Sequence, residues 1–241
     1  MTTASPPSGP DILTSGPDED ARMSRRSLVA LVAAAVLLIA GLAVWQLWPA
    51  PPPVFTLDDL QGVYAGMVRS DGTNDASVID RDRVAEDAGS VVPSACEPLF
   101  EATVLNRFPP GALDGVGTFW QLDRSAVSLF SYRFADTAGA GREYARLTQA
   151  LGTCRDTRVE LRAGPAGAGV LSGTRQDAAQ LGYVLAADGG TKLAVHVLAF
   201  SNTISWQFRY EPVPGAYAPL TAQRVMDSLA DQMRAVQDLH R

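Results

Sequence analysis

The sequence predicts an α+β protein in which a single N-terminal transmembrane helix precedes one extracytoplasmic domain. An uncharged run of 21 residues lies near the N-terminus, at 28–48. Farther along, three consecutive segments carry apolar residues with the period of a β-strand, and other segments show helical spacing. We therefore expect a twisted, mostly antiparallel sheet that is packed by helices.

Four regions are expected along the 241 residues. Residues 1–27 form a disordered cytoplasmic tail, because their Ser, Thr, Pro, Gly and Asp content is too polar to repay the entropy of ordering. Residues 28–48 form the transmembrane helix. Residues 49–55 form a short, stiff Pro-rich spacer, and residues 56–241 form the exported domain.

The apolar run has the length and the flanks of a membrane anchor. Eleven of its 21 residues are Leu, Ile or Val, and a helix of this length measures roughly 31 Å, which matches a bilayer core. Arg22, Arg25 and Arg26 lie just before it, whereas the next cation is Arg69. Such an excess of arginine on one side predicts a cytoplasmic N-terminus and a single-pass anchor in the cell membrane.

Cleavage of this segment is the alternative to a retained anchor. The residues "SRRSLV" resemble a twin-arginine export signal, and "GLA" at 41–43 has the small-x-small pattern of a cleavage site. Signal peptides, however, have apolar cores of about 7 to 15 residues, and this run is longer. We therefore expect the anchor to be retained.

The domain is expected to combine helices with strands. The expected helices lie at 56–66, 96–107, 138–154 and about 219–239. The expected strands lie at 116–123, 126–134, 157–161, 182–187, 191–201 and 203–210, the first two as a hairpin and the last three as a meander. Residues 69–93 are expected to be mostly loop, and residues 162–173 are expected to form a flexible loop.

The two cysteines are Cys96 and Cys154, and both lie on the exported side of the anchor. An isolated pair in an oxidising compartment usually forms a disulfide. Two free thiols or a redox pair are the alternative, although the close C-x-x-C spacing of redox pairs is missing. We predict a Cys96–Cys154 disulfide.

We expect no catalytic residues, cofactor or metal site. The only histidines are His196 and His240, which lack a zinc-binding motif. We interpret His196, which lies between valines, as a hydrogen-bonded strand residue, and we expect His240 to fray. The net charge of −6 without a basic stripe excludes nucleic acid as a partner.

An acidic segment in the predicted loop partly matches a calcium-binding pattern. Asp71, Asp75 and Asp82 fall at the first, fifth and twelfth positions of such a loop. Ala76 replaces the required glycine, so we interpret the segment as an acidic surface loop.

Aromatic residues suggest where a ligand could bind. Trp206, Phe208 and Tyr210 alternate along one expected strand and therefore share a face. Together with Trp120 they could line an apolar cleft for a lipid or a glycan, or they could form the core beneath the helices. Both interpretations stay open at this point.

The order of these features resembles a known family. The quoted segments are "PSACEPLF", the helix "GREYARLTQALGTC" that ends in a cysteine, and the strand "SWQFRY" before a long last helix. They resemble the extracellular sensor domains of mycobacterial PknH-type receptor kinases and related actinobacterial envelope lipoproteins, over about 90–240. The chain departs from that family in having one cysteine pair where the family typically has two disulfides, and in having no kinase domain.

The resemblance implies a ligand-binding or envelope-interaction domain with a cleft, and not an enzyme. We therefore expect a membrane-anchored, non-catalytic, sensor-like domain whose ligand is a lipid, a glycan or another envelope protein. An envelope assembly or scaffold protein that contacts other membrane proteins is the alternative. An enzyme would require a buried carboxylate or His196 to converge with a serine in a cleft.

Overall fold

The computed structural model describes residues 34, 36–37, 54–67, 76–79, 81, 89–122, 125–211 and 219–240, and among these it leaves out the side chains of 120–122, 125–126, 211 and 219–222. The chain divides into two units, Met1–Pro51 and Pro52–Arg241. In the first unit the three described residues are helical.

Three predictions fall largely outside these residues. They are the cytoplasmic tail, most of the transmembrane segment and the loop with Asp71, Asp75 and Asp82. Among the helices that the structure does describe, none combines the length and the apolar character needed to cross a membrane.

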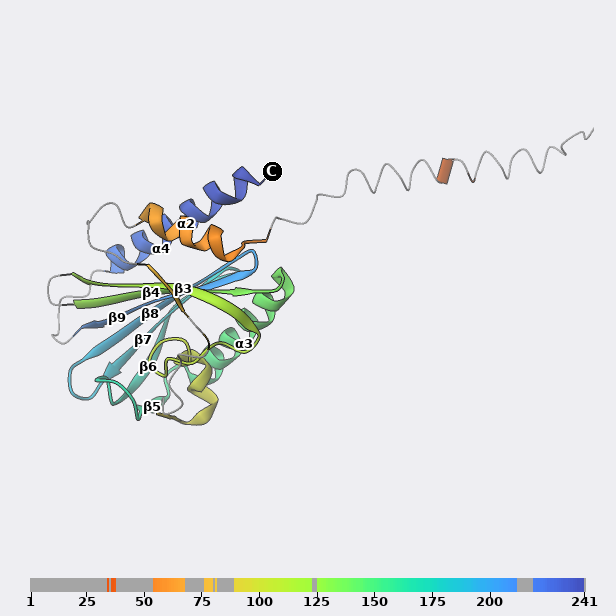
Figure 1. The fold of residues 1–241 in the computed structure, drawn as a ribbon. Helices are drawn as coiled ribbons and strands as arrows, with labels where there is room; N and C mark the ends of the chain where they lie inside the picture. The colour runs from red at the N-terminus through yellow and green to blue at the C-terminus, as the bar shows by residue number, and fades with distance from the viewer. Residues whose placement is uncertain are drawn as a thin grey trace, which may run out of the picture. The chain divides into compact units, whose positions relative to one another are not determined.

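A single antiparallel sheet organises the second unit (Figure 1). Its order is β1-β3-β4-β9-β8-β7-β6-β5-β2. The strands are β1 (Ser77–Ile79), β2 (Val91–Val92), β3 (Ala112–Leu122), β4 (Ser125–Phe134), β5 (Arg158–Leu161), β6 (Ala168–Gln176), β7 (Gln180–Ala187), β8 (Lys192–Phe200) and β9 (Thr203–Glu211).

Helices cover both faces of this sheet. They are α2 (Leu57–Met67), the 3-10 helix η3 (Ser94–Leu99), α3 (Thr137–Cys154) and α4 (Pro219–Leu239). Tyr132 of β4 packs in the core beneath α3 and η3, whereas Leu129 packs in a second core with α2 and α4. Because side chains alternate along a strand, these two cores lie on opposite faces. The expected α+β fold with a mostly antiparallel sheet is therefore confirmed.

Side chains that cap the first turns explain where two helices begin. The Asp136 carboxylate accepts a hydrogen bond from the Gly139 N–H at 2.6 Å and so caps α3. At α2, the Asp59 carboxylate accepts from the Thr56 N–H at 2.8 Å, while the Thr56 hydroxyl accepts from the Asp59 N–H at 3.2 Å. This reciprocal pair has the geometry of a capping box.

The loop predictions need correction. Residues 162–173 were expected to form a loop, but β6 begins at Ala168. Residues 69–93, expected to be mostly loop, contain the short strands β1 and β2, and the helix expected at 96–107 is the shorter η3. β1 and β2 are the two edge strands and β6 pairs with both β5 and β7, so tertiary pairing forms these strands where the local apolar pattern is weak.

Buried polar side chains fasten α2 and the segment before it to the sheet. The Asn202 amide, which is fully buried, accepts from the Phe55 N–H at 2.7 Å and donates to the carbonyls of Phe55 and Phe134 at 3.1 and 2.9 Å. The hydroxyls of Tyr64 and Ser131 lie 2.9 Å apart. Asn202 thus fixes the start of the domain to the turn between β8 and β9.

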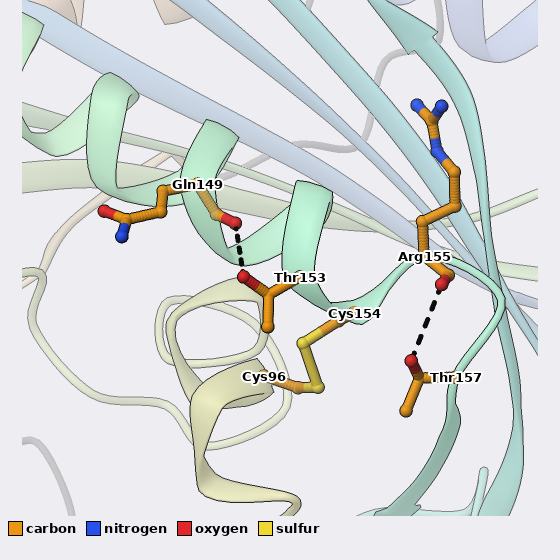
Figure 2. Close-up of a disulfide and its surroundings, with 6 residues drawn as sticks. All are labelled: Cys96, Gln149, Thr153, Cys154, Arg155 and Thr157. Carbon is orange, nitrogen blue, oxygen red and sulfur yellow. Dashed lines mark hydrogen bonds between the residues drawn. A yellow bond between two sulfur atoms is a disulfide. The ribbon is translucent and has the colours of Figure 1, made fainter.

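The predicted disulfide is present between Cys96 and Cys154, whose Cα atoms lie 5.8 Å apart (Figure 2). It joins the last residue of α3 to η3. Tyr183 of β7 donates its hydroxyl to the Leu99 carbonyl, and both residues are fully buried. The segment around η3 is therefore attached both to α3 and to the sheet.

Candidate functional site

Three of the predicted aromatic residues, Trp206, Phe208 and Tyr210, lie on the face of the sheet that α3 covers. Trp206 is 1% exposed, and its ring lies 5.5 Å from the ring of Tyr132. Phe208 is 9% exposed and lies 5.6 Å from Phe130. Tyr210 is only half-buried, so exposure increases along β9 away from Trp206.

This placement favours the core interpretation for Trp206 and Phe208 over the cleft interpretation. Trp120 pairs in register with Val127, and its side chain lies outside the structural description. The Nε1 atom of Trp206 is buried with no hydrogen-bond partner among the described residues. An apolar ligand cleft formed by Trp120, Trp206, Phe208 and Tyr210 stays a prediction.

A pocket of about 290 Å³ lies at the N-terminal half of α3, and we call it the α3 pocket. Its apolar lining includes Pro110 and Phe134. Its charged lining is Asp136, Arg142, Glu143 and Arg146. An apolar wall with a few fixed polar groups is the usual composition of a small-molecule site.

An ion-pair network, with one buried carboxylate, forms one wall of the α3 pocket. Glu143 is 4% exposed, and its two carboxylate oxygens accept from Nε and Nη2 of Arg146 at 2.8 Å each. Arg146 also donates to Glu101. Burial by itself lowers the pKa of Arg146, but the hydrogen bonds and charges of Glu143 and Glu101 outweigh burial and raise it. Arg146 therefore keeps its positive charge at physiological pH, and its hydrogen bonds hold it against Glu143 and Glu101.

Arg142 completes the pocket from the preceding turn of α3. Its side chain is exposed and makes no ion pair with any residue that the structure describes. Arg142 is therefore the cation in this pocket with donors available to an incoming anionic group.

His196 lies on the other face of the sheet, in a row of residues that pair across neighbouring strands. It pairs with Gln207 of β9 and with Gly182 of β7, which in turn pairs with Arg175 of β6. Burial, and to a lesser extent the charge of Arg175, lowers the pKa of His196. A neutral imidazole at physiological pH fits the interpretation of His196 as a strand residue.

The contact of His240 was missed by sequence reasoning. His240 was expected to fray, but its Nε2 atom lies 2.9 Å from Asp59 Oδ1, at the start of α2. Burial raises the pKa of Asp59, but the hydrogen bonds of Thr56 and His240 together outweigh it and lower the pKa.

The α3 pocket was also missed, because its walls come from segments that are distant in sequence. Arg142, Glu143 and Arg146 lie on the predicted helix, but Pro110 and Glu101 reach the pocket only through the tertiary fold. The one signal available was the spacing of these three charged residues, which places them within two turns of one helix.

The domain has the architecture of a large antiparallel sheet with helices on both faces and a disulfide between α3 and η3. The same fold occurs in the extracellular domain of PknH from Mycobacterium tuberculosis, with a TM-score of 0.57 at 9% sequence identity over 76% of this chain and 99% of that chain. The resemblance predicted from the sequence is thus confirmed for the fold.

A second solved structure, the Rv0999 ortholog from Mycobacterium smegmatis, aligns with a TM-score of 0.43 at 15% identity over 78% of this chain and 100% of that chain. No protein family model and no curated protein matches the sequence.

Proposed function

We propose that this chain is a membrane-anchored, extracytoplasmic, sensor-like domain that binds a ligand or a partner and carries out no catalysis. The observation that carries this proposal is the fold shared with the extracellular domain of PknH. The disulfide supports it, because such bonds persist in oxidising compartments. The uncharged run at 28–48, with arginines before it, supports the anchor and its orientation.

The α3 pocket is the place where this function would reside. Its volume of about 290 Å³ suits a small ligand or one end of a larger one. The apolar part of the ligand would contact Pro110 and Phe134, and an anionic group would face Arg142. The fixed network of Arg146, Glu143 and Glu101 would hold the wall in place.

A co-purification experiment tests the ligand. The full-length protein is isolated from its native envelope, extracted with organic solvent and analysed by mass spectrometry. We expect a bound small molecule that is lost in Arg142→Gln and retained in the matched control Arg224→Gln, which changes an exposed arginine of α4. An empty wild-type protein, or equal loss in both variants, would contradict a ligand in the α3 pocket.

Single-cysteine labelling tests the topology. A membrane-impermeant maleimide should label Ser228→Cys, at an exposed position of α4, in intact cells. It should label Ser15→Cys only after lysis. If the intact mass of the isolated protein corresponds to a chain that starts near Val44, the segment is cleaved and the anchor is overturned.

A scaffold role is the second candidate, and one observation favours it. Phe119 of β3 is 60% exposed, and Leu113 on the same strand is 47% exposed. Exposed large apolar side chains on one strand suit a contact with another envelope protein. Crosslinking from Phe119→p-benzoylphenylalanine in intact cells should then yield a discrete adduct, whereas the binding domain proposed first requires none.

A further inference from the structure

A second hollow, of about 520 Å³, lies where α3 ends and β6 ends, and we call it the β6 groove. It is lined by Arg155, Gly173, Thr174, Arg175, Gln176 and Asp177. It shares no lining residue with the α3 pocket. Two of its six residues are arginines, and they come from different elements.

Arg155 is held in place by its backbone. Its N–H donates to the Leu151 carbonyl at 2.9 Å at the end of α3, and its carbonyl accepts from the Thr157 hydroxyl. The preceding residue is Cys154, so the disulfide fixes the same point of the chain, and the Arg155 side chain extends away from it (Figure 2).

The Arg155 guanidinium packs directly over Gly173. A Cβ atom added to Gly173 would lie 2.8 Å from both Nε and Nη2 of Arg155, closer than such contacts occur. Glycine therefore makes room for the guanidinium at the floor of the groove. No ion pair joins Arg155 to any residue in the described part of the chain.

The second arginine is only partly neutralised. Nε of Arg175 donates to Asp177 Oδ2 at 2.9 Å. The other oxygen of Asp177 accepts from the N–H groups of Ala179 and Gln180 at 2.9 and 2.8 Å. The lining of the groove therefore carries two guanidinium charges against one carboxylate.

The backbone of β6 is also accessible along this groove. Leu171 exchanges hydrogen bonds with Thr157 and Asp156, so its N–H and carbonyl point toward the outer edge. Beyond Leu171, no strand in the described ranges pairs with that edge. The edge near Gly173 is therefore open to a ligand.

We propose that the β6 groove binds a phosphate group. A carboxylate has two oxygens, which a single guanidinium fork can satisfy, whereas a phosphate offers additional acceptors to a second guanidinium and to a hydroxyl. In the proposed site the guanidinium groups of Arg155 and Arg175 would donate to the phosphate, and the hydroxyl of Thr174, which also lines the groove, would donate a further hydrogen bond. The phosphate belongs either to free inorganic phosphate or to the headgroup of an anionic lipid.

Chemical modification of arginine tests the site. The full chain in dodecyl maltoside micelles is treated with phenylglyoxal, and adducts are quantified by peptide mass spectrometry. Inorganic phosphate at about four times its Kd should slow modification of Arg155 and Arg175 about fivefold. Chloride at equal ionic strength should not slow it, and the exposed control Arg224 should be unaffected in either case.

Two variants locate the effect. Gly173→Ala displaces the Arg155 guanidinium, and Thr174→Val removes the hydroxyl; each should reduce the protection of both arginines while thermal melts show a folded protein. Protection by phosphatidylglycerol alone assigns the site to a lipid headgroup, and protection by both probes assigns it to phosphate generally. No protection by either probe, equal slowing at Arg224, or full protection in both variants overturns the proposal. None of these results bears on the α3 pocket.

Discussion

Replacing Asn202 by alanine should destabilise the domain through the loss of three buried hydrogen bonds. The side-chain amide of Asn202 forms hydrogen bonds with the N–H and the carbonyl of Phe55 and with the carbonyl of Phe134. Asn202 has no exposed surface. At about 0.5 to 1.5 kcal/mol for each bond, the free energy of unfolding should fall by about 1.5 to 4.5 kcal/mol. For a domain of this size each kcal/mol lowers Tm by about 2 to 4 °C, so a fall of about 3 kcal/mol corresponds to about 6 to 12 °C.

Calorimetry and hydrogen exchange measure this effect together. The amide of Phe55 loses its acceptor in Asn202→Ala, so peptides that cover 54–60 should exchange faster than the rest of the domain. Asn202→Asp keeps an acceptor for Phe55 but loses both donors and places a carboxylate near two carbonyls. It should be at least as destabilised at neutral pH.

Gln149→Ala is the matched control, because Gln149 is exposed on α3 and the substitution keeps its backbone carbonyl, which accepts from the Thr153 hydroxyl (Figure 2). It should leave Tm within about 2 °C of wild type, as is usual for surface substitutions. An Asn202→Ala protein with unchanged Tm and unchanged exchange at Phe55 would refute the reasoning, since it would show that these bonds contribute no net stability.

Three further outcomes are expected. Replacing Cys96 and Cys154 by alanine should lower the free energy of unfolding by about 4 kcal/mol in denaturant melts, from the entropy of a 58-residue loop; an unchanged midpoint would contradict this. Gly62→Ala, with nothing within 4 Å of the new Cβ, should stabilise α2 by about 0.5 to 1 kcal/mol. Gly117→Ala, whose Cβ would lie 2.3 Å from an aromatic ring of β4, should destabilise the domain by about 1 to 3 kcal/mol. The same denaturant melts should show changes in the free energy of unfolding of opposite sign for the two variants. The pKa of Asp59 is lowered in the fold, so its contribution to stability is present above the ordinary carboxylate pKa and is lost as pH falls through the lowered value. Asp59→Asn should therefore weaken the dependence of stability on acid pH. If stability falls with pH in parallel in the variant and the wild type, the assignment is wrong.

The long, periodic elements could be predicted from the sequence. The helix expected at 138–154 occupies Thr137–Cys154, and the last helix expected at about 219–239 occupies Pro219–Leu239. In α3 the apolar residues recur on one face, and that face is the buried one. The three-strand meander was also predicted, because apolar residues there are dense and bounded by turn residues.

Elements that depend on distant partners could not be predicted. β6 contains Gly169 and Gly173 and lacks a clear alternation, but it forms because β7 pairs along it and β5 pairs with its first half. At Gly169 an added Cβ would lie 2.2 Å from the Ala186 carbonyl oxygen. That glycine is needed by the sheet, although in the sequence it has the appearance of a loop residue.

The candidate sites were hidden for the same reason. The sequence directed attention to aromatic residues such as Trp206, which the fold buries in its core. The α3 pocket and the β6 groove are built from arginines, whose partners are decided by tertiary contacts. Arg146 is committed to two carboxylates and Arg142 to none among the described residues, although both lie on one helix and differ by only four positions.

The contact between Asp59 and His240 has a practical consequence for rearranging the chain. It brings the first turn of α2 beside the residue that follows α4, so the two ends of the domain lie close together. A short linker could therefore join residue 240 to residue 54, with a new opening at the exposed Asp188–Gly189 turn between β7 and β8. Such a circular permutant should keep the disulfide and the sheet. A bulky reporter fused after His240, by contrast, would crowd the point where the chain passes into the Pro-rich spacer, so an insertion at that hairpin is the safer place for a label.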